Sequence, residues 1–257
     1  NPKGEYVRNV KDAPKQFHGF VIRKEKGGEF IYGADLTDQT IYKLTLGGKK
    51  VLTIPPTAVP EKFKRKGRGK NAKPRMRLTG MDVAPNGDLY VVDGYSSDHI
   101  HRFGSKGKYV TSFGGKKPPF NTKTLHKIAV DTRFKPARII GVDRQNFRVI
   151  HFSLEGEFLG VVNNNLLRPA AVAIHGDLAA IAEIRGRVAL LDKSGEVVKT
   201  IGYNEVLENR ENNKTPPARW FPGIVTAPHG VAFNANGDLF VAEYSVFGRV
   251  HRFNLVK

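Results

Sequence analysis

The sequence of 257 residues contains no cysteine. This absence excludes disulfide frameworks, zinc ribbons and thiol nucleophiles, so any metal would have to be bound by His or carboxylate side chains. Acidic residues are also scarce: 24 Asp and Glu stand against 42 Lys and Arg, which gives a formal net charge of +18. This excess of positive charge predicts an anionic partner or substrate, without saying which anion it is.

Long hydrophobic runs are missing as well. The longest, such as residues 170–174, are interrupted within a few residues, whereas a membrane-spanning helix needs about 18 or more apolar residues. We therefore expect no membrane span. The hydrophobic fraction of 40% and the charged fraction of 26% are ordinary for a folded globular protein. The sequence begins at Asn1 without an initiator Met or a signal peptide, which favours a processed, secreted or periplasmic protein. Nothing in it indicates an obligate protein partner.

Internal repeats are the strongest pattern in the sequence. Residues 81–114 and 230–257 share an apolar strand, an Asn-Gly-Asp turn, a strand ending in an acid, a loop and a strand ending in His-Arg-Phe. Looser copies begin at Gly19, Lys127 and Ala171. Each copy reads as four short antiparallel strands joined by Gly and Asn turns, which is typical of one β-propeller blade. A helical fold is not expected, because no period of 3.6 residues is sustained.

The two ends of the sequence suggest how the ring closes. The last copy stops after its third strand, at residues 249–256, while residues 1–10 resemble a fourth strand with its turn. Together they would form one complete blade, which would remove the exposed sheet edges of an open array. We therefore predict an all-β fold, a single β-propeller domain over residues 1–257. It should have five four-stranded blades, the last closed by the N-terminal strand.

Two linkers between blades are long, at residues 55–78 and 203–228. Because strands alternate in direction within a blade, both linkers should overhang the end of the ring where each innermost strand starts. Residues 61–77 hold nine Lys or Arg and one Glu, a local charge of +8. This basic segment is either a solvated loop or an anion-binding flap. The second linker carries the only Trp, Trp220, which could pack over the ring or line a pocket. The candidate anion-binding residues, with Trp220, are Lys64, Arg65, Lys66, Arg68 and Lys70.

The position that starts the innermost strand of each blade forms a column, which we call the strand-start column. It reads His18, Thr79, His126, Ala170 and His229. Only eight His occur in the whole chain, so three at five positions exceed the number expected by chance. Three imidazoles from different blades would point into the central tunnel, and three His ligands with an open fourth position are typical of a catalytic zinc. We predict zinc, or another divalent transition metal, at this trio; the alternative is that these His only cap strands or contact neighbouring backbone.

The ends of the second strands form a column of acids. It consists of Asp35, Asp93, Asp143, Glu183 and Glu243. Because the feature is present in every blade, we interpret these carboxylates as structural acceptors of backbone N–H groups. The residues that follow them differ between blades: Tyr95 follows a Gly after Asp93, and Arg144 follows Asp143 directly. Both should lie on the same face as the His, either as catalytic residues or as ordinary loop residues.

Five segments carry a family resemblance. In order they are QFHGF, DVAPNGDLYVVDGY, LHKIAVD, GVDRQNFRVIHFSLEGEF and APHGVAF. The repeats resemble NHL repeats, and the segment order looks like that of the peptidyl-α-hydroxyglycine α-amidating lyases (peptidylamidoglycolate lyases), over residues 17–253. The resemblance implies a catalytic zinc on the three column His, an active-site Tyr at Tyr95 in the DGY motif and a catalytic Arg at Arg144 in the DR motif. The implied reaction breaks a carbinolamine C–N bond and releases an amide and glyoxylate.

The sequence departs from this family in several ways. The family propeller has six blades, so a six-bladed ring with one blade outside this chain is the alternative to five. The family's N-terminal portion, with another catalytic Arg, and its disulfides have no counterpart. Its central calcium uses an Asp directly after the third His, where this sequence has Gly230, so a structural calcium is doubtful. The metal trio therefore transfers better than the substrate does.

Two classes of function stay open at this point. The first is a His-ligated zinc lyase that cleaves an α-hydroxyglycine-type C–N bond or acts on a related small carboxylate substrate. There the zinc would activate the substrate hydroxyl, Tyr95 would transfer a proton and Arg144 would bind the carboxylate. The second is a non-catalytic NHL module that binds RNA or an acidic polysaccharide through its basic face.

Overall fold

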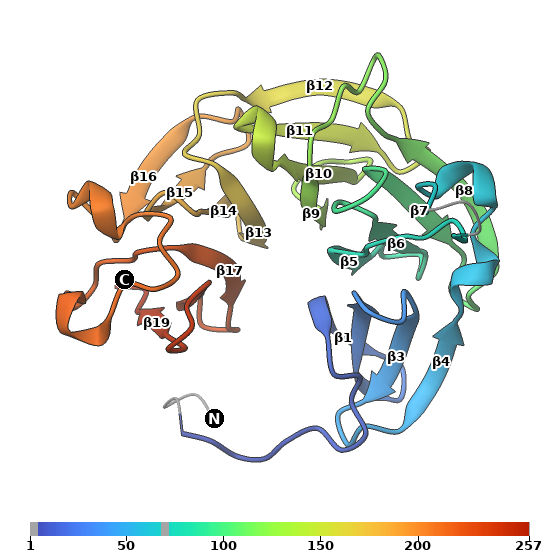
Figure 1. Ribbon diagram of the computed structural model, residues 1–257, viewed down its shortest axis with the longest axis horizontal. Helices are drawn as coiled ribbons and strands as arrows, with labels where there is room; N and C mark the ends of the chain where they lie inside the picture. Colours follow the sequence, from blue (N-terminus) through green and yellow to red (C-terminus); the bar gives the residue numbers. More distant parts are fainter. Residues whose placement is uncertain (1–4, 68–71, 257) are drawn as a thin grey trace.

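The computed structural model describes residues 5–67 and 72–256, whose strands form five antiparallel sheets around a central axis (Figure 1). The fold is a five-bladed β-propeller, which confirms the predicted fold class and blade number. Blade by blade, the strands are β1 (Phe17–Glu25), β2 (Gly28–Asp35), β3 (Ile41–Thr45) and β4 (Lys50–Ile54); β5 (Gly80–Val83), β6 (Leu89–Val92), β7 (His99–Phe103) and β8 (Tyr109–Gly114); β9 (Leu125–Asp131), β10 (Arg138–Asp143), β11 (Arg148–Ser153) and β12 (Phe158–Asn163); β13 (Pro169–His175), β14 (Leu178–Glu183), β15 (Arg187–Leu191) and β16 (Val197–Ile201); β17 (Pro228–Phe233), β18 (Leu239–Glu243) and β19 (Val250–Phe253).

In the part of the chain that the structure describes, helix is confined to short 3-10 turns between strands. They are η1 (Pro56–Ala58), η2 (Glu61–Phe63), η3 (Arg144–Asn146), η4 (Leu207–Asn209) and η5 (Pro217–Arg219). Within the described ranges, no helix has the length and apolar character that crossing a membrane requires.

The hydrophobic core lies between neighbouring blades, and strand β6 shows why. All four of its residues are buried. Leu89 and Val91 pack in the core shared with the first blade, whereas Tyr90 and Val92 pack in the core shared with the third. Because successive side chains of a strand point to opposite faces, one apolar strand can serve both interfaces. The continuous apolar runs of the second strands are therefore a consequence of stacking blades on both sides.

The described residues cover only one face of the fifth blade. Its Val241 packs against the fourth blade, while Ala242 and Val250, on alternate positions, are exposed. The innermost strands contact one another in the order β1, β5, β9, β13 and β17, and β17 and β1 are in weaker contact than any other neighbouring pair. We call this boundary between the fifth and first blades the seam.

The N-terminal segment does not complete the fifth blade in the part of the chain that the structure describes. Residues 5–10 lie in no strand, and the fifth sheet has three strands; residues 1–4 of the predicted closing strand lie outside the described residues. Val10 and Ala13 instead pack, with Phe17, against buried residues of β2 and β3. Within a blade, a hairpin turn fixes the register of neighbouring strands. No such turn connects residues 5–10 to β19, so burial of Val10 and Ala13 on the first blade outweighs pairing with the fifth.

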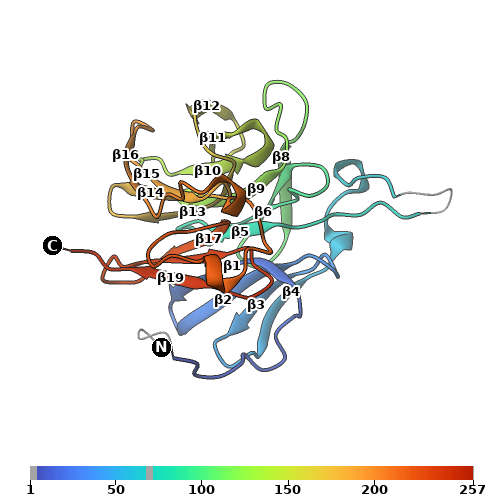
Figure 2. The ribbon, with the colours of Figure 1, turned by 60° about the vertical axis from the view of Figure 1, so that its left-hand side comes forward.

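The two long linkers take different forms. Residues 61–67 and 72–77 project away from the ring as two arms (Figure 2), bridged by reciprocal backbone hydrogen bonds between Arg65 and Arg75. The other linker folds over the fourth and fifth blades: the backbone N–H of Asn204 donates to Gly186, and that of Val225 donates to Gly202.

Candidate metal centre

The three column His occupy irregular positions at the starts of their strands. The register between the first two strands shifts at Phe17/Gly19, at Leu125/Lys127 and at Pro228/Gly230. His18, His126 and His229 are therefore the extra residues of β-bulges. A bulge bends its strand and changes the direction of a side chain, and here it turns each imidazole toward the ring axis. Ala170 occupies the same kind of position in β13.

The three imidazoles meet, as the repeat pattern predicts. Their candidate ligand nitrogens all lie within 4.8 Å of one another. The ring centroids are 4.7 Å apart for His126 and His229, 5.0 Å for His18 and His126, and 5.5 Å for His18 and His229. Residues from the first, third and fifth blades thus form one three-His group.

The other two members of the strand-start column orient these imidazoles. Nδ1 of His18 donates to the backbone carbonyl of Thr79 at 2.9 Å, and Nδ1 of His126 donates to that of Ala170 at 2.6 Å. A proton on Nδ1 leaves the lone pair on Nε2, which is the arrangement found around metal-binding His. This role was not predicted from the sequence, because any residue at these two positions supplies the same backbone carbonyl.

Burial keeps the three imidazoles neutral. It is the main cause that lowers the pKa of His18, although the hydrogen bond to Thr79 opposes it. Burial, followed by the charges of His229 and Arg144, holds the pKa of His126 well below 6.5. Burial, followed by the charge of His18, lowers the pKa of His229 to about 3. Neutral imidazole is the form that binds a metal.

Tyr95 lies directly beside the three-His group. Its hydroxyl donates to Nε2 of His126 at 2.9 Å and lies 3.2 Å from Nε2 of His18. The preceding Gly94 makes this position possible, because a Cβ there would overlap the carbonyl oxygen of Leu125. The DGY motif therefore has a local explanation: only glycine lets the chain pass close enough to bring Tyr95 to the axis.

Arginine side chains surround Tyr95. Nη1 of Arg144 donates to the Tyr95 hydroxyl at 3.3 Å, and its guanidinium lies 5.2 Å from the ring centroid. Nε of Arg144 is buried and has no hydrogen-bond partner among the described residues. The guanidinium of Arg77, at the base of the basic segment, lies 5.4 Å from the same ring. The site is therefore cationic and can attract an anion; Arg77 was not singled out from the sequence.

The column of acids has the structural role that we inferred. Asp35 and Asp93 accept backbone N–H groups from the turns that follow them. Every acid also accepts a backbone N–H from the linker that leads into its blade. The donors are Gln16 to Asp35, Arg77 to Asp93, Lys123 to Asp143, Leu167 to Glu183 and Thr226 to Glu243. These hydrogen bonds hold the segment that directly precedes each innermost strand, and so they position the residues of the strand-start column.

The described members of the predicted anion-binding set are not part of the three-His group. Lys64, Arg65 and Lys66 lie on the arms of the basic segment, whereas Arg68 and Lys70 fall outside the described residues. A recess of about 500 Å³ between the arms is lined mainly by Arg and Lys side chains.

Trp220 lies over the fifth blade. Its Nε1 donates to the carbonyl of Thr215 at 3.0 Å, and its ring packs against Phe247 and under the guanidinium of Arg249, 4.6 Å from the ring centroid.

Comparison with known proteins shows the fold but not the family. No protein-family model matches the chain, and a search of curated proteins gives no match. Similar solved structures include virginiamycin B lyase from Staphylococcus aureus, with a TM-score of 0.59 and 13% identity over 95% of this chain and 72% of that one. A catalytically inactive variant of that lyase, with one His replaced by Ala and with quinupristin, has a TM-score of 0.59 and 13% identity over 96% and 73%. Hydrazine synthase of Kuenenia stuttgartiensis has a TM-score of 0.57 and 12% identity over 98% and 70%.

Proposed function

We propose that the protein is a metal-dependent lyase that acts on a small carboxylate substrate carrying a hydroxyl next to a C–N bond. The observation that carries this proposal is the group of three neutral imidazoles, one buried and two partly buried, with the Tyr95 hydroxyl against two of their Nε2 atoms. Two further points support it. The sequence motifs resemble those of an α-hydroxyglycine lyase, and a similar propeller, virginiamycin B lyase, has an inactive variant in which one His is replaced.

The donor set suits zinc or another divalent transition metal. Such ions accept imidazole nitrogen, and three His with an open position are typical of catalytic sites. His18 and His126 already present Nε2 because their Nδ1 atoms are engaged by carbonyls. When bound, the metal would supply Lewis-acid activation of the substrate hydroxyl.

The chain's own residues divide the remaining work. Arg144 is placed to bind the substrate carboxylate, because its buried Nε is free of partners among the described residues and its guanidinium faces the Tyr95 hydroxyl. Cleavage converts the carbon that bears the hydroxyl into a carbonyl, breaks the C–N bond and moves one proton from the hydroxyl oxygen to the departing nitrogen. Tyr95 lies beside the imidazoles and is the group placed to carry that proton.

An assay of turnover and metal content tests this function. Protein expressed with zinc should contain about one metal per chain by mass spectrometry and should release glyoxylate from an N-acyl α-hydroxyglycine. His126→Ala should lose both properties. His175→Ala is the matched control, since His175 stacks on Phe233 away from the site. Wild-type protein with no stoichiometric metal would overturn the metal site, and metal-loaded protein without turnover would overturn the reaction.

The basic segment favours a second candidate function, the binding of RNA or an acidic polysaccharide. Its arms extend away from the ring (Figure 2) and enclose a recess lined by Arg65, Lys66, Lys73 and Arg75. Clustered cations on a projecting element bind a polyanion by releasing its counterions, which makes the affinity strongly salt-dependent.

Neutralising the arms tests this second function. Replacement of Lys64, Arg65 and Lys66 by Ala should weaken binding of single-stranded RNA and reduce the slope of log affinity against log salt by about 2. A control of equal charge change replaces exposed Lys on the blades, namely Lys26, Lys106 and Lys199. Equal losses in the two triple variants, or no RNA binding by wild type at low salt, would contradict it; an acidic polysaccharide is tested in parallel.

A further inference from the structure

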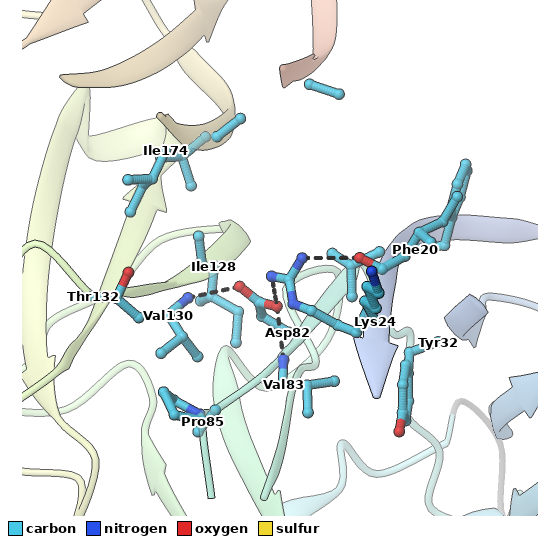
Figure 3. Close-up of a pocket in the computed structure, with 18 of the residues that line it drawn as sticks. Phe20, Lys24, Tyr32, Asp82, Val83, Pro85, Ile128, Val130, Thr132 and Ile174 are labelled. Carbon is cyan, nitrogen blue, oxygen red and sulfur yellow. Dashed lines mark hydrogen bonds and ion pairs between the residues drawn. The ribbon is translucent and has the colours of Figure 1, made fainter. Parts of the chain in front are cut away.

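The far half of the central channel contains a cavity of about 850 Å³ (Figure 3). The innermost strands of all five blades line it: β1, β5, β9, β13 and β17. The three-His group lies at the starts of these strands, whereas the cavity is lined by their later residues and by the turns beyond them. The cavity is therefore a separate site, on the side of the ring opposite the candidate metal centre.

Lys127 forms the inner end of this cavity. Lys127 directly follows His126, the extra residue of the bulge. Because a bulge interrupts the usual alternation of side chains, both side chains reach the channel. Two glycines leave room for it: a Cβ on Gly19 would lie 2.8 Å from Nζ of Lys127, and a Cβ on Gly80 would lie 2.7 Å from its Cδ. Larger residues at these two positions would displace the lysine, so the channel is shaped around this side chain.

The ammonium group of Lys127 has no hydrogen-bond or ion-pair partner among the described residues, although an acid is close by. Asp82 is already engaged: its carboxylate accepts the backbone N–H groups of Val83 and Val130, each at 2.7 Å, and pairs with Arg23 (Figure 3). A positive charge confined in a channel, with the nearest carboxylate used by other groups, is a site for a single negative charge.

The rest of the wall is mainly apolar. Phe20, Ile128, Val130 and Ile174 line the cavity together with Asp82 (Figure 3). A pocket of several hundred Å³ with apolar walls and few polar groups is typical of a small-molecule site. Here the Lys127 ammonium group supplies a positive charge beside apolar walls, so charge and shape together select the ligand.

We propose that this cavity binds an amphipathic monocarboxylate, with its carboxylate on Lys127 and its apolar chain along the channel. The proposed ligand is bound by residues other than the three His, although the charge of Lys127 also helps to lower the pKa of His18 and of His229. The propeller would then have two ligand sites, one toward each end of its central channel. Lys127 lies between the three imidazoles and the cavity.

Calorimetric titration with octanoate, in the presence of a chelator, tests the proposal. Wild-type protein should bind octanoate at least about tenfold more tightly than acetate, which lacks the chain, and than 1-octanol, which lacks the charge. Lys127→Met, of similar length without the charge, should weaken octanoate about tenfold or more and leave octanol unchanged. Lys199→Met is the matched control, because Lys199 is exposed on the outermost strand of the fourth blade and does not line the cavity.

Each alternative gives a distinct result. Equal binding of octanoate and octanol would show a merely apolar channel, and loss of octanoate binding in Arg144→Ala instead of Lys127→Met would place the ligand at the metal centre. A second measurement needs no variant. Octanoate should protect Lys127, but not the exposed Lys199, from reductive methylation in the wild-type protein, as mapped by mass spectrometry; equal labelling of Lys127 with and without octanoate would overturn the proposal.

Discussion

Glu243 and Glu183 occupy the same position in neighbouring blades, yet their surroundings predict opposite responses to pH. Both side chains are fully buried. Burial alone would raise the pKa of Glu243, but hydrogen bonds from His251, Arg249 and Thr226 outweigh it and lower the pKa to about 2. Burial also raises the pKa of Glu183, where Arg187 and a backbone N–H do not offset it.

The contribution of the Glu243 carboxylate to the free energy of unfolding follows from the linkage between protonation and folding. A carboxyl whose pKa falls from 4.5 to about 2 on folding contributes about 3 kcal/mol at neutral pH. Partial solvation of its partners reduces this to about 2 kcal/mol. Glu243→Gln should therefore lower the free energy of unfolding by about 2 kcal/mol at pH 7. Because the folded pKa is depressed, this contribution is present above pH 4.5 and is lost as the pH falls toward 2.

Glu183→Gln provides the matched comparison. A carboxyl whose pKa is raised on folding is most favourable when protonated, so its contribution to stability declines as the pH rises through 4.5. The substitution should cost about 1 kcal/mol or less at pH 7, and the cost should grow as the pH is lowered. Urea unfolding at pH 7 and pH 3.5, followed by the fluorescence of Trp220, measures both variants. Equal losses with the same pH dependence would refute the assignment of opposite shifts to the two acids.

Three further predictions concern the candidate site. Zinc at 100 times its dissociation constant should stabilise the folded protein by about 2.7 kcal/mol, or about 5 °C in melting temperature; His126→Ala should abolish this shift in differential scanning fluorimetry and His175→Ala should keep it, and the reverse would exclude the site. Tyr95→Phe and Arg144→Ala should each lower lyase turnover about 100-fold with zinc content unchanged by mass spectrometry, whereas unchanged turnover would remove their assigned roles. Gly94→Ala should lower turnover and melting temperature together, because its Cβ has no room beside the backbone; wild-type values for both would contradict the explanation of the DGY motif.

The repeats made the main features of the fold and site predictable. Equivalent residues of successive blades must lie at the same end of the ring, so the convergence of His18, His126 and His229 follows from their shared place in the repeat. The structural role of the acids follows in the same way, since an acid in every blade serves the blade. The closing strand was harder to predict: residues 5–10 resemble a strand, but whether such a segment pairs depends on the burial that competes with pairing.

Features built from backbone groups could not be found from side-chain patterns. The carbonyls of Thr79 and Ala170 orient two of the imidazoles, and any residue at those positions would supply the same carbonyl. The position of each bulge depends on the register in which two strands pair. The same sequence can pair in registers that differ by one residue, so the sequence alone does not locate the bulge. No role was predicted for Lys127, because the room for its side chain depends on Gly19 and Gly80 in two other blades. Only the folded ring brings these three residues together.

The seam has a consequence for the order in which the molecule folds. His18 and His229 lie about 210 residues apart in the sequence, yet their rings meet across the boundary between the last and first blades. Their contact can form only when every intervening blade is in place, and such non-local contacts form late because the chain must first lose the entropy of the loop between them. Local opening of either terminal blade would separate the imidazoles while the inner blades stay folded. Hydrogen exchange should therefore find the weakest protection at β1 and β17, and the three-His group would serve as an indicator that the whole ring has assembled.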